Sequence, residues 1–232
     1  MKKLLASLLV ICLTVPAIGQ ISPFLEKGKS GLGVFVAADQ GYGFQGLAGS
    51  LGGSLKGVLD VEFLYNHDNY DQVLTQLLND KAVSSGYTGN LIWWLIRKSP
   101  IPQLEVNVGL RGSVEYFTYK DYLYTGDTGG ESSYDSYFGG HLGFHTLLKI
   151  NLDDSWSLAP GYYAVTQYGK EYWTEEGVKE SGSYFGILSN LSVTLLKKFS
   201  GGSTLHLTAY EFLDTYGSQP YYAFLIGCIF PL

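Results

Sequence analysis

The chain has 232 residues, with 15 Lys and Arg against 21 Asp and Glu, so its formal net charge at pH 7 is −6. This acidic balance argues against nucleic-acid binding, which needs a basic footprint, and against membrane attachment through a polybasic surface. Glycine (30) and tyrosine (19) are abundant, which favours a β architecture, because aromatic side chains fit pleated surfaces and glycine serves turns and bends.

The first residues have the composition of a secretory signal. Lys2 and Lys3 precede an apolar stretch, residues 4–18, and a small-x-small cleavage sequence ends it. We therefore predict a cleaved signal peptide at residues 1–19, export by a Sec-type route, and a mature β-barrel domain at residues 20–232.

The mature part lacks the run of about 20 apolar residues that a membrane-spanning helix needs, since its longest uninterrupted run is residues 91–96. Apolar residues instead recur at every second position, the pattern of half-buried strands. Pro160 cannot donate to a strand ladder, so we expect a bulge or irregularity there. The predicted strands are residues 30–39, 43–53, 58–66, 87–97, 103–118, 134–152, 156–168, 183–198, 204–212 and 221–230.

The connections between these strands alternate in length, as periplasmic turns and extracellular loops do in outer-membrane barrels. The short ones are residues 54–57, 98–102, 153–155 and 199–203; the long ones are 67–86, 119–133 and 169–182, 214–219 is intermediate, and 40–42 is an exception. Within the first long connection, apolar spacing predicts a brief amphipathic helix at residues 70–79.

These observations together predict an all-β protein, a closed antiparallel up-and-down transmembrane β-barrel in the outer membrane of a Gram-negative bacterium, in contact with its lipid. Ten strands are expected, with eight as the alternative, and both termini on the periplasmic side. A secreted soluble β-sandwich or lipocalin-like binder would also show alternating strands and stays open as an alternative.

The polar faces of the strands would point into the lumen, which in a barrel of this size is largely filled by side chains. Because an unpaired buried charge is costly, opposite charges there should form salt bridges and hydrogen bonds. A structural polar lumen is therefore expected, with a small conducting pore as the alternative. The residues expected in this lumen network are Asp60, Glu62, Glu105, Asn107, Arg111, Glu115, His141, His145, Lys149, Asn190 and His206.

Neither a metal site nor a cofactor is expected. His141 and His145 are four residues apart on one strand, roughly 13 Å, too far to share one ion. Asp127, Glu131 and Asp135 fall in one long predicted loop, where carboxylates could hold a cation, but their spacing does not match an EF-hand loop and solvated charge is the favoured interpretation.

The end of the chain carries a short motif at Gly227, Phe230 and Leu232, although Leu225 stands where a polar residue is usual. With this motif and its strand pattern, the mature chain resembles the small outer-membrane β-barrels of diderm bacteria, such as OmpX or the OmpA transmembrane domain. The resemblance implies that Gly227, Phe230 and Leu232 form the signal read by the barrel-assembly machinery.

His206 and Thr208 form a His-x-Thr sequence that could supply a base and a nucleophile. Two outer-membrane hydrolase families, the lipid A deacylase PagL and the outer-membrane phospholipase, use His-x-Ser with a carboxylate or amide partner on the barrel exterior. Here threonine replaces serine and His206 belongs to the polar, inward face. We therefore predict a non-catalytic barrel with a structural or surface-interaction role, whose long loops could bind an extracellular ligand. A small-solute pore or transporter is the alternative, and a lipid-modifying enzyme is less favoured.

Overall fold

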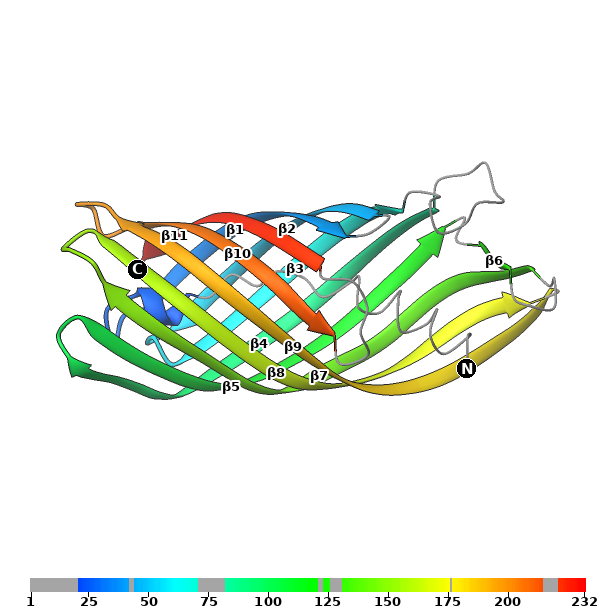
Figure 1. Ribbon diagram of the computed structural model, residues 1–232, viewed down its shortest axis with the longest axis horizontal. Coiled ribbons are helices and arrows are strands. Elements are labelled where there is room, and N and C mark those ends of the chain that lie inside the picture. Colours follow the sequence, from blue (N-terminus) through cyan, green and yellow to red (C-terminus); the bar gives the residue numbers. More distant parts are fainter. Residues whose placement is uncertain are drawn as a thin grey trace.

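The computed structural model describes residues 21–41, 44–70, 82–120, 123–125, 131–175, 177–214 and 221–232. These residues form one closed antiparallel β-barrel (Figure 1). Ten strands make the ring in chain order, β1 pairs with β11 to close it, and β5 pairs with β7. A short eleventh strand, β6, pairs only with β7 at the rim. Within the described residues the predicted ten-strand barrel is confirmed, and the eight-strand alternative and the stacked sheets of a β-sandwich are wrong.

The strands fall into two groups by length. Five neighbouring strands have 11 or 12 residues, and we call them the short wall; the next five have 17 to 21 residues, and we call them the long wall. The short wall consists of β10 (Thr204–Asp214), β11 (Tyr221–Pro231), β1 (Gly31–Gly41), β2 (Phe44–Leu55) and β3 (Leu59–Tyr70), and the long wall of β4 (Ala82–Ile101), β5 (Leu104–Lys120), β7 (Glu131–Asn151), β8 (Trp156–Glu175) and β9 (Val178–Lys198), with β6 (Leu123–Thr125) beside it.

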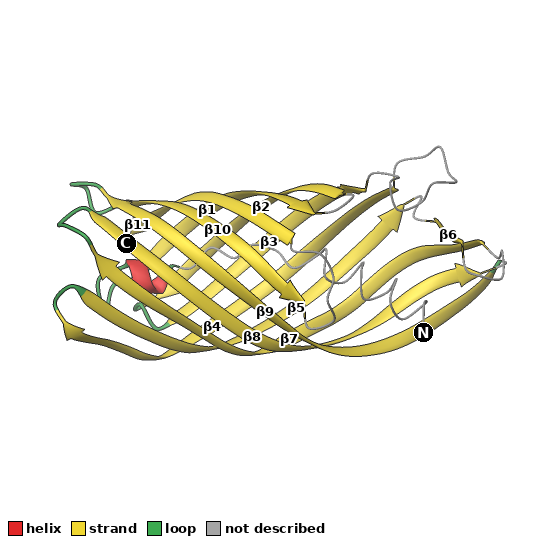
Figure 2. Cartoon of the chain, in the orientation of Figure 1, coloured by secondary structure: helices red, strands yellow, loops and turns green. Residues whose placement is uncertain are grey.

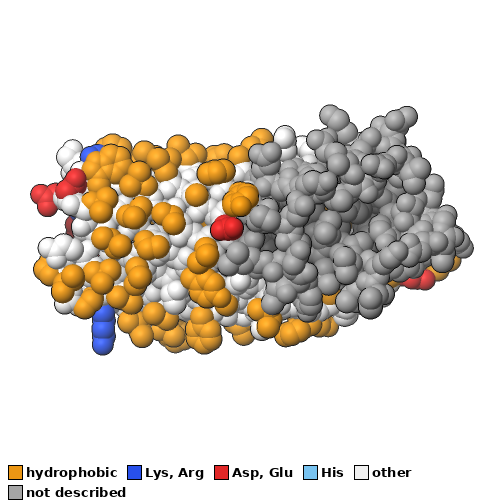
Figure 3. Space-filling view, viewed as in Figure 1, with side chains coloured by type: hydrophobic (Ala, Val, Ile, Leu, Met, Phe, Trp, Pro, Cys, Tyr) orange, Lys and Arg blue, Asp and Glu red, His pale blue; other side chains and the backbone are white. Residues whose placement is uncertain are grey.

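The barrel is polar inside and apolar outside. Along β5, Asn107, Arg111 and Glu115 are buried, whereas the intervening Val114 and Tyr116 are exposed. Hydrophobic side chains cover the described part of the face in Figure 3, where charged side chains are few. This distribution is the reverse of a soluble ligand-binding barrel, which hides its apolar residues inside.

The short turns all lie at one end of the barrel, which we call the turn end. Three are close to their predicted positions, and the one predicted at residues 98–102 falls at 102–103, because β4 continues to Ile101. The C-terminus and the start of β1 lie at the same end (Figure 1). Between β2 and β3, Lys56 and Gly57 both have positive φ, as in the two-residue turns that match the twist of a hairpin. Among the described residues no helix is long and apolar enough to cross a membrane.

The predicted long connection at residues 169–182 is wrong. Strand β8 continues to Glu175 and β9 begins at Val178, with unbroken pairing from Gly169↔Tyr184 to Glu175↔Val178. Both faces of this extension carry polar residues, so the alternation that identifies a strand disappears although the ladder of backbone hydrogen bonds continues.

The irregularity predicted at Pro160 takes another form. Pro160 pairs in register with Val193, and the ladder with β7 is present at Leu147↔Gly161 and again at Ile150↔Leu158 without a shift. The missing N–H therefore interrupts pairing locally, and the expected bulge is absent.

Other expectations fall partly or wholly outside the described residues. Residues 1–20, which include the predicted signal peptide, lie outside them, as do 71–79 of the predicted helix and Asp127. Tyr70 ends β3 as a strand residue, and Glu131 and Asp135 belong to β7 and not to a loop.

Candidate functional site

A short segment closes the turn end of the barrel from inside. Residues 21–25, which we call the plug, contain a 3-10 helix, Ser22–Phe24, which Figure 2 shows at the turn end within the outline of the strands. Ile21, Phe24 and Leu25 are buried. These residues precede the first predicted strand, and the strand pattern alone does not place them inside the lumen. The three apolar side chains explain this position, because they leave water by entering the barrel.

A buried carboxylate holds the start of the plug. Asp60, on β3, accepts hydrogen bonds from the Ile21 backbone N–H (3.2 Å) and from Trp94 Nε1 on β4 (2.9 Å), both at Oδ2. The Phe24 ring meets His206 edge-on at 4.4 Å between ring centroids. Asp60 on β3 and His206 on β10 both belong to the short wall, so these contacts hold the plug on that side.

Arg97 fastens the end of the plug. Its Nε and Nη2 lie 3.0 and 2.9 Å from Glu105 Oε1. Nη2 also donates to the Leu25 carbonyl (3.2 Å), and Nη1 donates to the Gly57 carbonyl (2.9 Å). One guanidinium therefore joins β4, β5, a hairpin turn and the plug, a task that suits the fixed fork of arginine donors.

Gly227 has a packing role in the same region. It pairs with Phe35 across β1 and β11, and a Cβ at Gly227 would overlap the Phe35 ring. Phe35 lies 5.7 Å from His206, beside the plug. Phe230 and Leu232, the other two residues of the C-terminal motif, are exposed. Recognition of this motif by an assembly machinery remains a prediction.

The middle of the lumen contains a buried guanidinium. Arg111 on β5 is 1% exposed, and its Cζ lies 4.1 Å above the centroid of the Tyr163 ring. His145 lies between Tyr163 (5.9 Å) and Trp94 (5.4 Å). Among the described residues, Arg111 Nε and Nη1 have no hydrogen-bond partner. A buried charge needs polar neighbours, so these two nitrogens are a place where bound water would satisfy the guanidinium.

Carboxylates nearby are hydrogen-bonded by neutral side chains. Glu62 accepts a short hydrogen bond from the Ser50 hydroxyl and a longer one from Asn90 Nδ2 (3.4 Å). Trp94 and Ser50 are inward-facing residues that the sequence prediction did not include in the lumen network. For Trp94 the reason is local, because residues 91–96 are apolar on both faces and do not reveal which face is inward.

Further from the turn end, Glu115 is the centre of a second group. It accepts a hydrogen bond from the Tyr137 hydroxyl (3.1 Å) and lies 2.8 Å from His141 Nε2. Tyr184 adds a short hydroxyl–hydroxyl contact to Tyr137. Phe117 packs against Tyr137, with ring centroids 6.1 Å apart. These aromatic residues were also missing from the predicted set, because tyrosine and phenylalanine give no signal that separates lumen from exterior.

Two of the predicted lumen residues, Glu115 and His141, lie in direct contact. Arg111 stacks on the Tyr163 ring. Glu105 and Lys149 are partly buried near the turn end, and nine of the predicted residues are buried inside the barrel: Asp60, Glu62, Asn107, Arg111, Glu115, His141, His145, Asn190 and His206.

His206 and Thr208 both face inward and are buried. Thr208 Oγ1 lies 2.9 Å from Thr194 Oγ1, and His206 packs against Phe24 and Phe35. The pair therefore points away from the exterior surface, where the two hydrolase families have theirs. Within the described residues, no group of three His, Cys, Asp or Glu side chains is placed to hold a metal ion.

No protein-family model matches the sequence, and no curated protein matches it. Solved structures with a similar course of the chain include three β-barrel proteins of different roles. They are the translocator domain of the autotransporter NalP from Neisseria meningitidis (11% identity, TM-score 0.49, covering 89% of this chain and 90% of that one), the outer membrane protease OmpT from Escherichia coli (9%, 0.41, 88% and 95%) and the NanC porin (11%, 0.41, 87% and 100%). Because each likeness is loose and the three roles differ, none of them assigns an activity to this chain.

Proposed function

We propose that this chain is an integral outer-membrane β-barrel whose turn end faces the periplasm. Three properties of the barrel support this. Its apolar residues face outward, where hydrocarbon would surround them. Its ring is closed, so no strand edge would be left without hydrogen bonds in a bilayer. Its short-wall strands have 11 or 12 residues, which suits the roughly 9–11 residues that cross a membrane.

We further propose a structural or surface-interaction role without a conducting channel and without catalysis. The observation that carries this proposal is the plug, whose buried Ile21, Phe24 and Leu25 occupy the lumen at the turn end. Asp60 and Arg97 fasten it from two sides. A solute would have to displace both sets of hydrogen bonds to pass.

The long wall supports the surface-interaction part of the proposal. Strands β7, β8 and β9 have 20 or 21 residues, about twice what a bilayer requires. Their extension carries exposed polar residues such as Lys170, Lys179 and Glu180. In the proposed orientation it would stand outside the cell, available to an extracellular ligand. The barrel-assembly machinery, reading Gly227, Phe230 and Leu232, is the partner proposed at the other end.

Single-channel recording in planar lipid bilayers tests the proposal. The folded protein should give no stable channels, whereas Asp60→Ala and Arg97→Ala, combined in one variant, should give frequent openings because the plug is released. Gel mobility before and after heating verifies that the variant is still a folded barrel. Large stable channels in the unmodified protein would contradict a plugged lumen.

A second function, a narrow solute pathway, is favoured by one observation. Several buried polar atoms have no hydrogen-bond partner among the described residues, including Arg111 Nε, Gln167 Nε2 and both amide atoms of Asn190. Such groups are normally satisfied by ordered water, which indicates a hydrated lumen beyond the plug. Small stable currents in the unmodified protein that the plug variant leaves unchanged would support this second function over the first.

A further inference from the structure

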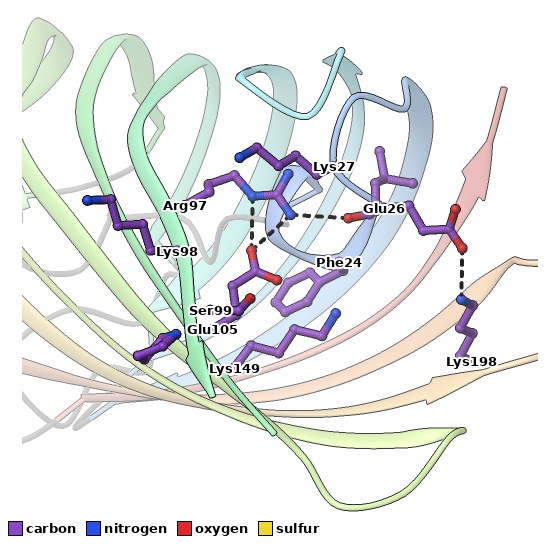
Figure 4. Close-up of a pocket in the computed structure, with 11 residues that line it drawn as sticks. Phe24, Glu26, Lys27, Arg97, Lys98, Ser99, Glu105, Lys149 and Lys198 are labelled. Atoms are coloured by element: carbon purple, nitrogen blue, oxygen red, sulfur yellow. Dashed lines mark hydrogen bonds and ion pairs between the residues drawn. The ribbon is translucent and has the colours of Figure 1, made fainter. Parts of the chain in front are cut away.

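The turn end contains a cavity of about 690 Å³ between the plug and strands of the long wall. Figure 4 shows the side chains that line it. The chain as a whole is acidic, yet five cationic side chains and only two acidic ones line this cavity. The cationic residues are Lys27, Arg97, Lys98, Lys149 and Lys198, and the acidic ones are Glu26 and Glu105.

Two of the five cations already have acidic partners. Arg97 is bonded to Glu105 (2.9 Å). Lys198 Nζ lies 3.2 Å from Glu26 Oε1, in a pair whose side chains are half or more exposed, and an exposed pair of this kind contributes little. The remaining three, Lys27, Lys98 and Lys149, form no ion pair with any described residue. The side chains that line the cavity therefore have a formal excess of positive charge, five cationic against two acidic.

Lys149 lies deepest among the three. It comes from β7 and is partly buried, whereas Lys27 and Lys98 are exposed. Lys149, like Phe24, also borders a second cavity of about 520 Å³, so this lysine lines both cavities. Asp153 borders the second cavity as well. Asp153 Oδ1 accepts hydrogen bonds from the backbone N–H groups of Ser155 and Trp156, with N···O distances of 2.7 Å each.

We propose that this cavity is a binding site for a phosphate-bearing anion with at least two negative charges. Ammonium groups around a hollow with low-dielectric walls concentrate positive potential, and lysine binds phosphate as a point charge from several directions. The volume falls within the range of small-molecule sites, about 300–1,000 Å³. The proposal concerns the turn end alone and stands whether or not the lumen conducts.

Two sources offer the same chemistry: a soluble phosphorylated solute and the headgroup of an anionic phospholipid. Isothermal titration of the folded protein in non-ionic detergent micelles separates them, with inorganic pyrophosphate as the first probe and short-chain phosphatidic acid as the second. If pyrophosphate binds, a soluble phosphorylated anion is a sufficient ligand for the site. Binding of the lipid alone identifies a headgroup site.

Charge-neutralising variants locate the site. Lys149→Gln should weaken binding about tenfold or more, the loss of one charge-assisted contact, and Lys98→Gln should weaken it about threefold because that side chain is more exposed. Lys149→Arg should restore most of the affinity. Lys170→Gln is the matched control, since Lys170 is an exposed lysine on the long-wall extension beside Tyr172, and it should bind like the unmodified protein.

Gel mobility before and after heating would reveal whether Lys149→Gln fails to fold. In that case Lys98→Gln, at an exposed position, still tests the site. The proposal is overturned when neither probe binds at concentrations of about 1 mM. It is equally overturned when folded Lys149→Gln and Lys98→Gln bind as tightly as Lys170→Gln.

Discussion

The short wall and the long wall enclose the same lumen but differ in the length of their strands. Short-wall strands of 11 or 12 residues have the length that a bilayer requires, and they hold the plug through Asp60 and His206. Long-wall strands of up to 21 residues continue beyond that length. The comparison teaches that the apolar exterior and the plug define the barrel, whereas the extension of the long wall is an addition to it.

The two walls also differ in what fills the lumen beside them. Near the short wall the contacts are close and specific, as where Phe35 lies over Gly227. At the start of the extension, Tyr137, Tyr184 and Phe117 form an aromatic group, and Glu115 accepts a hydrogen bond from Tyr137. We therefore expect substitutions at the plug to cost much more stability than changes in the extension.

The largest effect is expected at Asp60. Asp60→Ala leaves the Ile21 N–H and Trp94 Nε1 buried without their acceptor, so the free energy of unfolding should fall by about 3 kcal/mol. Asp60→Asn, which keeps one acceptor oxygen, should lose less. Urea unfolding in detergent micelles followed by tryptophan fluorescence measures both, and equal losses for the two variants would show that the charge matters and the acceptor does not.

The next effect is expected at Gly227. Gly227→Ala forces a methyl group into the Phe35 ring and should lower the free energy of unfolding by about 2 kcal/mol. Gly49→Ala is the matched control, because a Cβ there has nothing within 4 Å. A control that loses as much stability as Gly227→Ala would mean that glycine is needed for backbone reasons and not for the aromatic contact.

A smaller effect is expected from shortening the long wall. Lys170 pairs with Ser183, so replacing residues 171–182 by Asn-Gly should form a tight hairpin turn at that level. The free energy of unfolding should change by no more than about 1 kcal/mol, and the barrel should still show heat-modifiable gel mobility. Failure of this shortened protein to fold would make the extension part of the barrel core.

The smallest effect is expected at the turn residue Asp153. The backbone N–H groups of Ser155 and Trp156 donate to its carboxylate and lower its pKa. A lowered pKa in the folded state contributes stability above the ordinary aspartate pKa, and this stability is lost as the pH falls through the folded-state value. Asp153→Ala should therefore be slightly less stable at pH 7, and the difference from the unmodified protein should shrink at strongly acid pH. Asp154→Ala at the adjoining exposed position serves as control, and a difference that grows on acidification would contradict this account.

Much of the barrel was predictable because alternation follows directly from a closed sheet between two environments. Residues 103–118 show this best, since Glu105, Asn107 and Arg111 are on one face and Val114 on the other, as found. The alternation gave no prediction where both faces of a strand carry residues of the same kind. At Trp93 and Trp94 both faces are apolar, and beyond Gly169 both are polar, so neither phase nor strand end was visible.

The plug and its contacts were not predictable for a different reason. Ile21, Phe24 and Leu25 give an apolar segment with no period, and its destination depends on a cavity that exists only once distant strands have closed. Arg97 likewise bonds to Leu25 and Gly57, residues far from it in sequence. The lumen residues could be named from the strand pattern, but their partners could not.

The central claim is that residues on alternate sides of one strand face lipid and lumen. Spin labels at Val114→Cys and Ser113→Cys, in a chain with Cys12 and Cys228 replaced by alanine, test it in lipid vesicles by their collision rates with oxygen and with a water-soluble nickel complex. We predict that the label at position 114 meets oxygen far more than nickel, as lipid-exposed groups do, and that the label at 113 is shielded from oxygen. A label at position 114 that collides mainly with the nickel complex would contradict the account.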